Sequence, residues 1–405
     1  MSHPRRFLIA TWDGGGNTPP AINLGMRLVR RGHRVRMIGW ESLSQRSAEA
    51  GVEFTTYRSM SRWPENLSMD DAWDRVDAFL HGDATRGDIL AAARDFRPDV
   101  LVLDCMMGAG FAAARQLSLP SSVLVHVLYS AFVSGWGDQV MHASVADLLA
   151  ATERVLALVP PGFDAPVALP ANTSYVGPIT RPQRDADVQQ TADLEMISRP
   201  GDPWVLLTLS TTLQRQTEAL PRLIEAVESL PVRVLLTLGG VIPTGAVKAP
   251  GNVTVRDFVP HDAVLPHMAA VICHAGLSTI TAALAAGVPL MCIPQGRDQD
   301  MNSGPRGGLA SRAGRRARIR RGGDRRRCAR RHWGPVGARE RSSLRRGGRG
   351  ARRWRARHRR RRAARRIDDL PVMTERTWIA TTGDARLCLR GGEPQAAGGA
   401  RFSGS

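Results

Sequence analysis

The chain has 405 residues, of which 43% are hydrophobic, and a formal net charge of +19 at pH 7. This length allows two domains with full cores. The sequence shows no N-terminal signal segment, no apolar run of membrane-spanning length and no cluster of metal ligands, and its five cysteines lack CxxC spacing. We therefore expect a cytoplasmic protein with reduced thiols and no metal, rather than an exported or membrane-anchored one.

The positive charge is confined to one segment. Residues 304–366 contain 27 Arg against two acids, Asp324 and Glu340, which leaves a net charge of about −6 for the rest of the chain. A domain that binds nucleic acid usually spreads its basic residues over a folded face or a helix. The charge distribution therefore argues against a specific nucleic-acid partner.

Strand and helix patterns alternate in the first half of the chain. A buried strand is predicted at residues 7–12, followed by a loop at 13–17 and a helix that begins at Pro19 and Pro20 and ends at Gly32. Further strands are predicted at residues 35–40, 52–57, 100–103, 122–127 and 155–159, and helices at 69–94 and 109–117. This alternation predicts a parallel sheet covered on both faces.

A second alternating set follows a polar connection. Between residues 160 and 203 the pattern gives way to Pro, Asn, Asp and Gln, with one short strand at 174–176. Strands are then predicted at residues 204–209, 232–238, 253–256, 269–273 and 290–293, with a helix at 218–230. The sequence thus predicts an α/β protein with two Rossmann-like, doubly wound domains.

The segment 273–299 carries the strongest functional signal. A short strand runs into a turn at His274, Ala275 and Gly276, and a helix is predicted to begin at Ser278 and Thr279. A helix start offers free backbone N–H groups and the positive end of a dipole, and glycine lets an anion come close. We expect a phosphate at this turn.

Polar side chains follow the next strand of the same segment. Gln295, Asp298 and Gln299 come after the strand at 290–293, at the sheet edge where ligands bind in open α/β folds. A carboxylate and two amides suit hydroxyl groups better than phosphate. Together the two strand ends predict a ligand that is half diphosphate and half sugar, although a generic βα turn with a hydrogen-bonded histidine is the alternative for the first motif alone.

These motifs resemble the donor-site signature of bacterial nucleotide-sugar glycosyltransferases that act on macrolides, enediynes and other secondary metabolites. The matching residues are His274, Gly276, Ser278, Thr279, Gly287, Pro289, Pro294, Asp298 and Gln299. Ser278 departs from the family pattern, which usually has Gly there. The resemblance covers residues 5–303 and implies the two-lobed GT-B fold, with the acceptor on the first lobe and the nucleotide sugar on the second.

The resemblance also implies roles for the donor-site residues. His274 and Thr279 would bind the diphosphate, with Gly276 and Ser278 in the same turn, while Asp298 and Gln299 would hold the sugar. Two further matches complete the donor site: Ser210 and Thr211 after the first strand of the second lobe, and Val259 in the loop that presents backbone groups to the base. For the hydroxyls at 210–212 a plain helix cap is an equally good explanation.

The implied reaction is transfer of a (deoxy)sugar, with inversion, from a dTDP- or UDP-linked donor to an apolar natural-product aglycone in antibiotic biosynthesis. No further cofactor is implied. The family places its catalytic base, a His or an Asp, in the loop after the first strand, where this chain has Asn17. An amide has no usable basicity near neutral pH.

Three residues are alternative bases. They are Asp13, in the same loop, Asp104, at the end of the strand 100–103, and His126, at the end of another strand. Each also has an ordinary explanation, as a helix cap or a hydrogen-bonded histidine. An acceptor that ionises easily would need no strong base.

Aromatic residues of the first lobe are expected to line the acceptor pocket, because such walls suit flat or macrocyclic aglycones. The candidates are Trp63, Trp73, Trp136, Phe79, Tyr129 and Phe132, together with His126. The alternative is that half of these aromatic side chains fill the core.

After Ser303 the sequence departs from the family. The following segment has no sustained apolar period, and the chain has one lysine, Lys248, against 55 Arg, which indicates a gene rich in G and C. Our hypothesis is a frameshift close to Gly304, which sequencing of the gene would test. A segment so dense in one charge should be largely disordered, so we expect an incomplete second domain and a poorly soluble or inactive chain.

The expected organisation has four parts. They are an acceptor-binding domain at 1–180, a linker at 181–202, a truncated nucleotide-sugar-binding domain at 203–303 and an Arg-rich tail at 304–405. Two other functions stay open: the tail as an arm that binds RNA or DNA non-specifically through phosphates, and a nucleotide-sugar epimerase of the same fold. A homodimer is a further open alternative.

Overall fold

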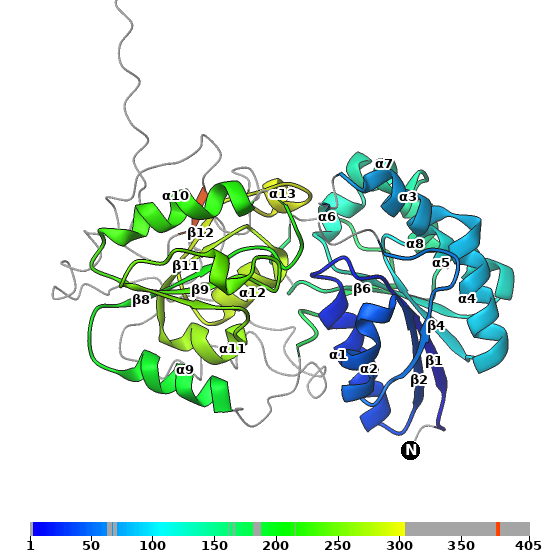
Figure 1. The fold of residues 1–405 in the computed structure, drawn as a ribbon. Coiled ribbons are helices and arrows are strands. Elements are labelled where there is room, and N and C mark those ends of the chain that lie inside the picture. The colour runs from blue at the N-terminus through cyan, green and yellow to red at the C-terminus, as the bar shows by residue number, and fades with distance from the viewer. Residues whose placement is uncertain are drawn as a thin grey trace, which may run out of the picture.

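The computed structural model describes residues 3–62, 67, 71–160, 162–164, 167–180, 188–214, 216–303 and 378–380. They form two helix-covered sheets, which Figure 1 shows as two lobes side by side, the first in blue to cyan and the second in green to yellow. The predicted α/β class with two Rossmann-like sheets is confirmed. The predictions for Trp63, and for the tail other than residues 378–380, lie outside the described residues.

The first lobe contains seven parallel strands in the order β3-β2-β1-β4-β5-β6-β7. The strands are β1 (Arg6–Ala10), β2 (Arg34–Gly39), β3 (Glu53–Thr56), β4 (Val100–Asp104), β5 (Ser121–Val125), β6 (Arg154–Ala157) and β7 (Thr173–Tyr175). The helices are α1 (Thr18–Arg30), α2 (Ser44–Glu49), α3 (Trp73–His81), α4 (Asp83–Phe96), α5 (Gly108–Leu117), α6 (Tyr129–Phe132), α7 (Gly135–Met141) and α8 (Val145–Ala150), with a 3-10 turn at Glu41–Leu43.

The second lobe contains six strands in the order β10-β9-β8-β11-β12-β13. The strands are β8 (Trp204–Thr208), β9 (Arg233–Thr237), β10 (Val253–Arg256), β11 (Met268–Cys273), β12 (Leu290–Cys292) and β13 (Trp378–Ala380). The helices are α9 (Val188–Ser198), α10 (Gln216–Glu228), α11 (His261–Val264), α12 (Leu277–Ala285) and α13 (Gln299–Ser303), with 3-10 turns at Thr244–Ala246 and Leu265–His267. Only β13 pairs antiparallel, with β12, among the strands described in this lobe.

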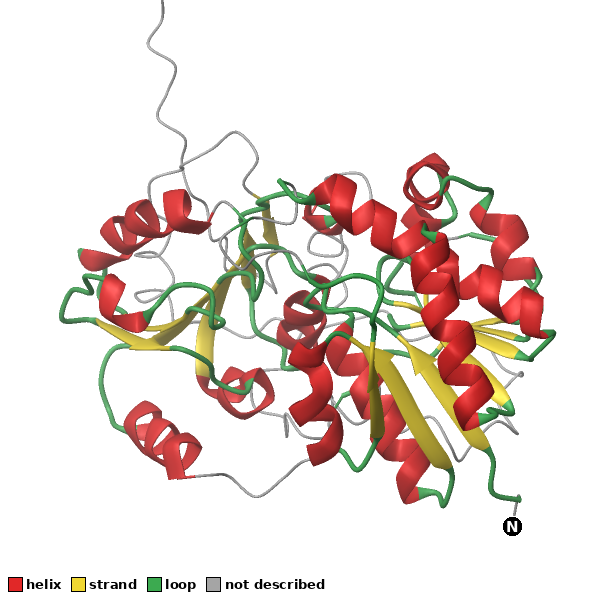
Figure 2. Cartoon of the chain, turned by 45° about the vertical axis from the view of Figure 1, so that its right-hand side comes forward, coloured by secondary structure: helices red, strands yellow, loops and turns green. Residues whose placement is uncertain are grey.

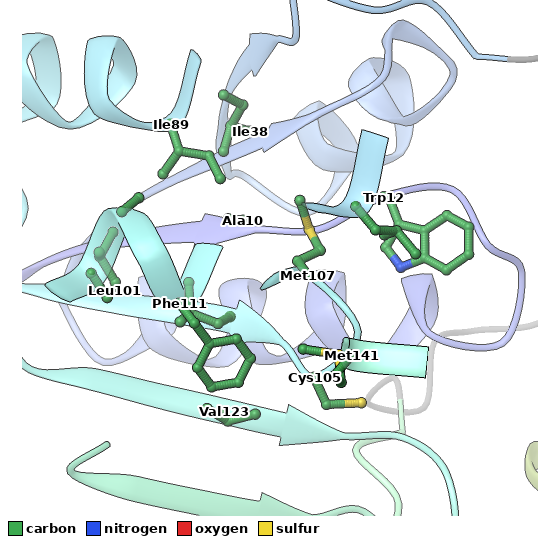
Figure 3. Packing of buried hydrophobic residues seen from close by; sticks show 14 of the residues in the cluster. Ala10, Trp12, Ile38, Ile89, Leu101, Cys105, Met107, Phe111, Val123 and Met141 are labelled. Atoms are coloured by element: carbon green, nitrogen blue, oxygen red, sulfur yellow. The ribbon is translucent and has the colours of Figure 1, made fainter. Parts of the chain in front are cut away.

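Apolar residues alternate between the two faces of the first sheet. Leu8 and Leu101 enter a core cluster with side chains of α3, α4 and α5, whereas Ile9 and Val102 pack with α1 on the opposite face. Figure 3 shows part of the first cluster, where Leu101 lies near the α5 residue Phe111. Because each fully buried Leu or Ile contributes about 1.5–3 kcal/mol, burial on both faces holds this sheet between its helices.

The second sheet is covered in the same way, and Figure 2 shows helices on either side of its strands. Leu206 and Val271 pack with Ile280 of α12 on one face, and Leu207 and Ile272 belong to the cluster that includes α10 on the other. The sequence predicts the strands well because long apolar runs are typical of parallel sheets with two covered faces.

The predicted helix at 69–94 is divided in two. Gly82 lies between α3 and α4 in an extended conformation, with φ −72° and ψ 150°, and a Cβ atom at this position would lie 2.3 Å from the carbonyl oxygen of Ala78. The prediction of one helix was therefore wrong, since the apolar period runs through Gly82 while the backbone turns there. None of the helices described is both long and apolar enough to cross a membrane.

Helix α9 and strand β13 lie in segments for which irregular structure was expected. Helix α9 lies in the segment expected to be an irregular linker, and packs on the second lobe through buried Ile197 and an ion pair of 2.8 Å between Asp193 and Arg256. Its mostly polar sequence carries little helical period, so tertiary contacts with α11 and β10 decide its place. Strand β13 comes from the Arg-rich tail, for which no strand was expected.

Candidate active site

Each sheet has a position where consecutive connections leave in opposite directions. In the first sheet this position lies between β1 and β4, and in the second between β8 and β11. The loops after these strands separate and leave a crevice at the carboxyl edge, where ligands of open α/β sheets bind. Asn17 and Asp104 follow β1 and end β4, and Ser210 and His274 follow β8 and β11.

The donor-site loops begin side by side. Thr208, Cys273 and Cys292 are partners in register across β8, β11 and β12, so the chain leaves all three strands at the same edge. The residues expected to bind the diphosphate and the sugar come directly after these strands. Topology therefore brings the loop after β8 together with the loops after β11 and β12, which lie about 65 and 85 residues further along the sequence.

Helix α12 begins one residue earlier than expected. Gly276 is its N-cap residue, with φ −64° and ψ 130°, and no side chain caps the helix start. Ser278 and Thr279 consequently lie in the first turn, Ser278 exposed and Thr279 buried. The first N–H groups of this helix lack a side-chain cap, as expected for a helix start that binds an anion.

The imidazole of His274 packs directly over this turn. Burial is the main cause that lowers its pKa to about 4, and the nearby charge of Arg297 lowers it further, against a backbone hydrogen bond at Thr208. Its Nδ1 atom is buried and has no hydrogen-bond partner among the residues described. His274 is therefore neutral near pH 7, with one ring nitrogen left for a ligand.

Gly276→Ala should displace His274. A Cβ atom at Gly276 would lie 2.5 Å from Nε2 of His274, too close for a real contact. We expect a loss of about 1–3 kcal/mol in unfolding free energy and weaker nucleoside-diphosphate binding, measured by denaturant unfolding and calorimetry. Gly245→Ala is the matched control, because a Cβ there meets nothing within 4 Å. Equal effects of both substitutions would contradict the expectation.

Asn302 connects the two halves of the donor signature. Its Nδ2 donates to the carbonyl oxygen of Ala275 at 3.1 Å and to Oδ2 of Asp298 at 3.0 Å, and the residue is fully buried. The His274 turn and the Asp298 carboxylate therefore belong to one site. Sequence reasoning did not assign a role to Asn302, although its place four residues after Asp298 on a helical turn was a usable signal.

Gln299 is buried and both ends of its amide are engaged inside the protein. Its Nε2 donates to Oε1 of Gln214 at 2.8 Å, and its Oε1 accepts from the backbone N–H of Gln295 at 2.7 Å. Gln214 in turn donates to Oγ of Ser210 at 2.8 Å. In this arrangement Gln299 and Ser210 hold the loops in place, and Thr211 is the exposed hydroxyl of its turn.

Arg297 is a site residue that sequence reasoning missed. It has a left-handed backbone conformation (φ 59°), and its guanidinium donates to Oγ1 of Thr212 at 3.0 Å and to the carbonyl oxygen of Gly14 at 3.4 Å. It therefore bridges the donor loops and the first lobe, beside His274. The signal was weak, because a lone arginine in a loop has no characteristic spacing.

The loop after β1 faces the donor site across the lobes. A Cβ atom at Gly15 would lie 3.1 Å from Cγ2 of Thr212, and one at Gly16 would lie 3.9 Å from Oγ of Ser278. Gly15 has φ +94°, a conformation that favours glycine. Close approach of the two lobes here depends on these small residues.

Asn17 and Asp104 form a buried pair. Nδ2 of Asn17 donates to Oδ2 of Asp104 at 2.7 Å and to the carbonyl oxygen of Trp12 at 2.8 Å. These acceptors fix the orientation of the amide, and its Oδ1 has no hydrogen-bond partner in the described part of the chain. Asn17 is the N-cap residue of α1 but makes no side-chain cap bond, because its side chain is directed to Asp104.

His126 completes this cluster on the other side of the carboxylate. Its Nε2 lies 3.1 Å from Oδ1 of Asp104. Burial opposes charge on the imidazole, but Cys105 and Asp104 raise the pKa of His126 well above its usual value. Burial likewise opposes the charged form of Asp104, but His126 and the hydrogen bonds from Met106 and Asn17 lower its pKa. The pair is therefore an imidazolium and a carboxylate at neutral pH.

Asp13, another alternative base, lies apart from this cluster. Its carboxylate accepts from Oγ of Ser42 at 2.9 Å and lies 3.5 Å from Nε of Arg62. These partners hold it toward the first lobe's own surface loops. The structure thus joins Asn17, Asp104 and His126 and gives Asp13 different neighbours.

The aromatic candidates divide into two groups. Phe79, Tyr129 and Phe132 are fully buried, so they fill the core. Trp73 and Trp136 are partly buried, on α3 and α7, and pack against the first core cluster. These two keep surface that an acceptor could contact.

The loop that is expected to face the nucleotide base contains one exposed aromatic ring. Val259 is buried in the second-lobe core, so only its backbone is available to a ligand. The neighbouring Phe258 is 66% exposed. Sequence reasoning placed the loop but did not single out this side chain.

Comparisons with known proteins identify the relatives of this chain. Residues 224–306 match the family described as erythromycin biosynthesis protein CIII-like, C-terminal domain. The chain is 31% identical over 332 residues to the elloramycin glycosyltransferase of Streptomyces olivaceus, covering 74% of this chain and 82% of that protein. It is 26% identical over 347 residues to 4'-demethylrebeccamycin synthase of Lentzea aerocolonigenes, covering 71% and 82%.

Solved structures share the fold. The glycotransferase of kitacinnamycin superposes with a TM-score of 0.57 at 24% identity, covering 75% of this chain and 84% of that one. The calicheamicin glycosyltransferase gives a TM-score of 0.55 at 23% identity, covering 71% and 79%. The chain therefore belongs to the family of antibiotic-type glycosyltransferases, enzymes of the two-lobed GT-B fold.

Proposed function

We propose that this protein transfers a (deoxy)sugar from a dTDP- or UDP-linked donor to an apolar natural-product aglycone, with inversion at the sugar carbon. Names of its relatives support this substrate class, since they include an elloramycin glycosyltransferase and a mycarosyltransferase that acts on demethyllactenocin. The donor is itself a substrate, and the proposed reaction needs no resident cofactor.

The observation that carries the proposal is the convergence of opposite ligand chemistries around Asn302. The start of α12, His274 and Arg297 supply N–H donors and positive charge for a diphosphate. Asp298, tied to the same turn through Asn302, supplies a carboxylate for sugar hydroxyls. Anion donors and hydroxyl acceptors in one site fit a nucleoside-diphosphate sugar.

Direct titration tests this donor. We expect the chain to bind dTDP or UDP, and a panel of nucleotide sugars to raise its thermal unfolding temperature by different amounts. Asp298→Asn should weaken the binding of the sugar-linked nucleotides and leave free dTDP or UDP unaffected. If Asp298→Asn binds the sugar-linked nucleotides as tightly as the unmodified chain does, the assignment of Asp298 to the sugar is wrong.

Phe258→Ala tests the position of the base. An exposed aromatic ring in the base loop supports stacking, which contributes about 1–3 kcal/mol per base. We expect the dissociation constant of the nucleoside diphosphate to rise by roughly 5- to 150-fold in calorimetry. Leu169→Ala, another exposed apolar residue, is the control. Unchanged binding by Phe258→Ala would place the base elsewhere.

The position of the two half-sites on different lobes supports the proposed inversion. We infer that the diphosphate leaves toward α12 while the acceptor approaches from the side of Asn17. His126 is charged and has no free basic nitrogen, and both carboxylate oxygens of Asp104 are engaged by Asn17, His126 and the backbone N–H of Met106. The amide oxygen of Asn17 would orient the acceptor hydroxyl without removing its proton. Acceptors that ionise easily, such as phenols or activated nitrogens, are therefore the preferred class.

We propose that Trp73 and Trp136 contact the aglycone. Both are partly buried on helices at the same end of the first lobe. Neither the nucleic-acid alternative nor the epimerase gains support from the relatives, which are named as glycosyltransferases or synthases.

A further inference from the structure

A histidine pair and a carboxylate from α3 and α7 meet in the first lobe and share no residue with the cluster of Asn17, Asp104 and His126. Asp77 and His81 lie one turn apart on α3, and His142 caps the end of α7. The ligand atoms of these three residues all lie within 4.8 Å of one another. The sequence prediction of no metal-ligand cluster missed this group, because about 60 residues separate His142 from the other two.

One of the two contacts with Asp77 is a hydrogen bond, and the other is close to the spacing of two ligands around one metal ion. Nε2 of His142 lies 2.8 Å from Oδ1 of Asp77, and Nε2 of His81 lies 3.7 Å from the same oxygen. Four tetrahedral ligands at about 2.0–2.2 Å from Zn²⁺ would lie about 3.4 Å apart. The two imidazole rings are nearly perpendicular, at 83°, with centroids 4.9 Å apart.

The imidazole ring of His81 is partly buried and packs against the start of α5. A Cβ atom at Gly108 would lie 2.4 Å from Nδ1 of this ring. The packing holds Nε2 of His81 on the side of Asp77.

The hydrogen bond between His142 and Asp77 leaves Nε2 of His81 unsatisfied. This buried nitrogen has no hydrogen-bond partner among the described residues and lies 3.7 Å from Oδ1 of Asp77. A cation bound by all three side chains would satisfy it.

We propose that Asp77, His81 and His142 bind one divalent transition-metal ion of the zinc class, and that this ion ties α3 to α7. Two imidazoles and one carboxylate are a typical donor set for Zn²⁺, with a water in the fourth position. The two helices carry Trp73 and Trp136, so the ion would hold the proposed aglycone walls at a fixed separation. The site itself does not rest on the proposed function.

Zinc titration of the full chain, prepared without a histidine tag and dialysed against chelator, tests the proposal. Calorimetry should show one saturable Zn²⁺ site, Co²⁺ should give visible absorption bands, and Zn²⁺ should raise the unfolding temperature. His142→Asn, which tolerates the left-handed backbone there (φ 50°), and Asp77→Asn should each weaken Zn²⁺ binding by roughly 10-fold or more.

His267→Gln, at an exposed histidine in the second lobe, is the matched control and should bind Zn²⁺ like the unmodified chain. Unfolding in chelator shows whether His142→Asn is folded, and Asp77→Asn carries the test if it is not. Equal Zn²⁺ affinity of the unmodified chain and a folded variant would overturn the proposal, as would the absence of saturable binding. Asp104, Cys105 and His126 form another group of possible ligands. If Zn²⁺ bound there instead, the variants at Asp77 and His142 would bind it as tightly as the unmodified chain.

Discussion

Asn17→His is expected to raise kcat with aliphatic alcohol acceptors by roughly 10²- to 10⁴-fold, the usual contribution of a positioned general base. The amide of Asn17 donates to Oδ2 of Asp104 at 2.7 Å. An imidazole N–H at this position can make the same bond, and its second nitrogen is then free to take the acceptor's proton. Turnover at saturating donor measures the effect.

The acceptor and a second substitution provide the controls for this gain. Phenolic acceptors should gain little, because they ionise without a strong base. The double variant Asn17→His and Asp104→Asn should lose most of the gain, since the imidazole then lacks the carboxylate that orients and stabilises it. An equal gain with both acceptor classes would show that Asn17 does not limit proton transfer. Because the chain as it stands is expected to be inactive, the comparison uses a chain in which the hypothesised frameshift close to Gly304 is corrected.

Arg297→Met is expected to weaken binding of dTDP or UDP by roughly 30-fold or more, which corresponds to a loss of about 2 kcal/mol or more for a charge-assisted contact. The guanidinium lies beside His274, donates to Thr212 and reaches the first lobe at Gly14. It is thus placed to bind a diphosphate and to close the lobes over it.

The matched control for this substitution is Arg222→Met, at an exposed arginine of α10. Arg297→Lys should fall between the two, because an ammonium supplies charge but lacks the planar fork of the guanidinium. Calorimetric titration with the free nucleoside diphosphate separates this effect from contacts with the sugar. Equal affinity of Arg297→Met and the unmodified chain would remove Arg297 from the donor site.

The positions of the candidate donor-site loops at one edge of the sheet were predictable from the sequence. The turn at His274 and the pair at Asp298 follow consecutive strands, and parallel strands connected by a helix deliver their carboxyl ends to one edge. The contacts within the site were not predictable in this way. Asn302 and Arg297 act through partners on other segments, and such pairings leave no period in the sequence.

The catalytic cluster shows the same division. The sequence alone established that Asn17 cannot be a base and proposed Asp104, His126 and Asp13 in its place. The structure brings Asn17, Asp104 and His126 together at the ends of β1, β4 and β5. Asp13 instead accepts a hydrogen bond from Ser42 and pairs with Arg62. Protonation of the cluster depends on burial and on neighbouring charges, which only the folded chain creates.

The sequence by itself determined the α/β class, the strands with two covered faces and the donor signature. These features depend on apolar residues, glycines and helix starts that lie close together in the sequence. Tertiary structure decided the break at Gly82, the place of α9 on the second lobe, the engaged amide of Gln299 and the meeting of His81 with His142. These features arise from contacts between residues distant in the sequence, where packing and electrostatics outweigh local preference.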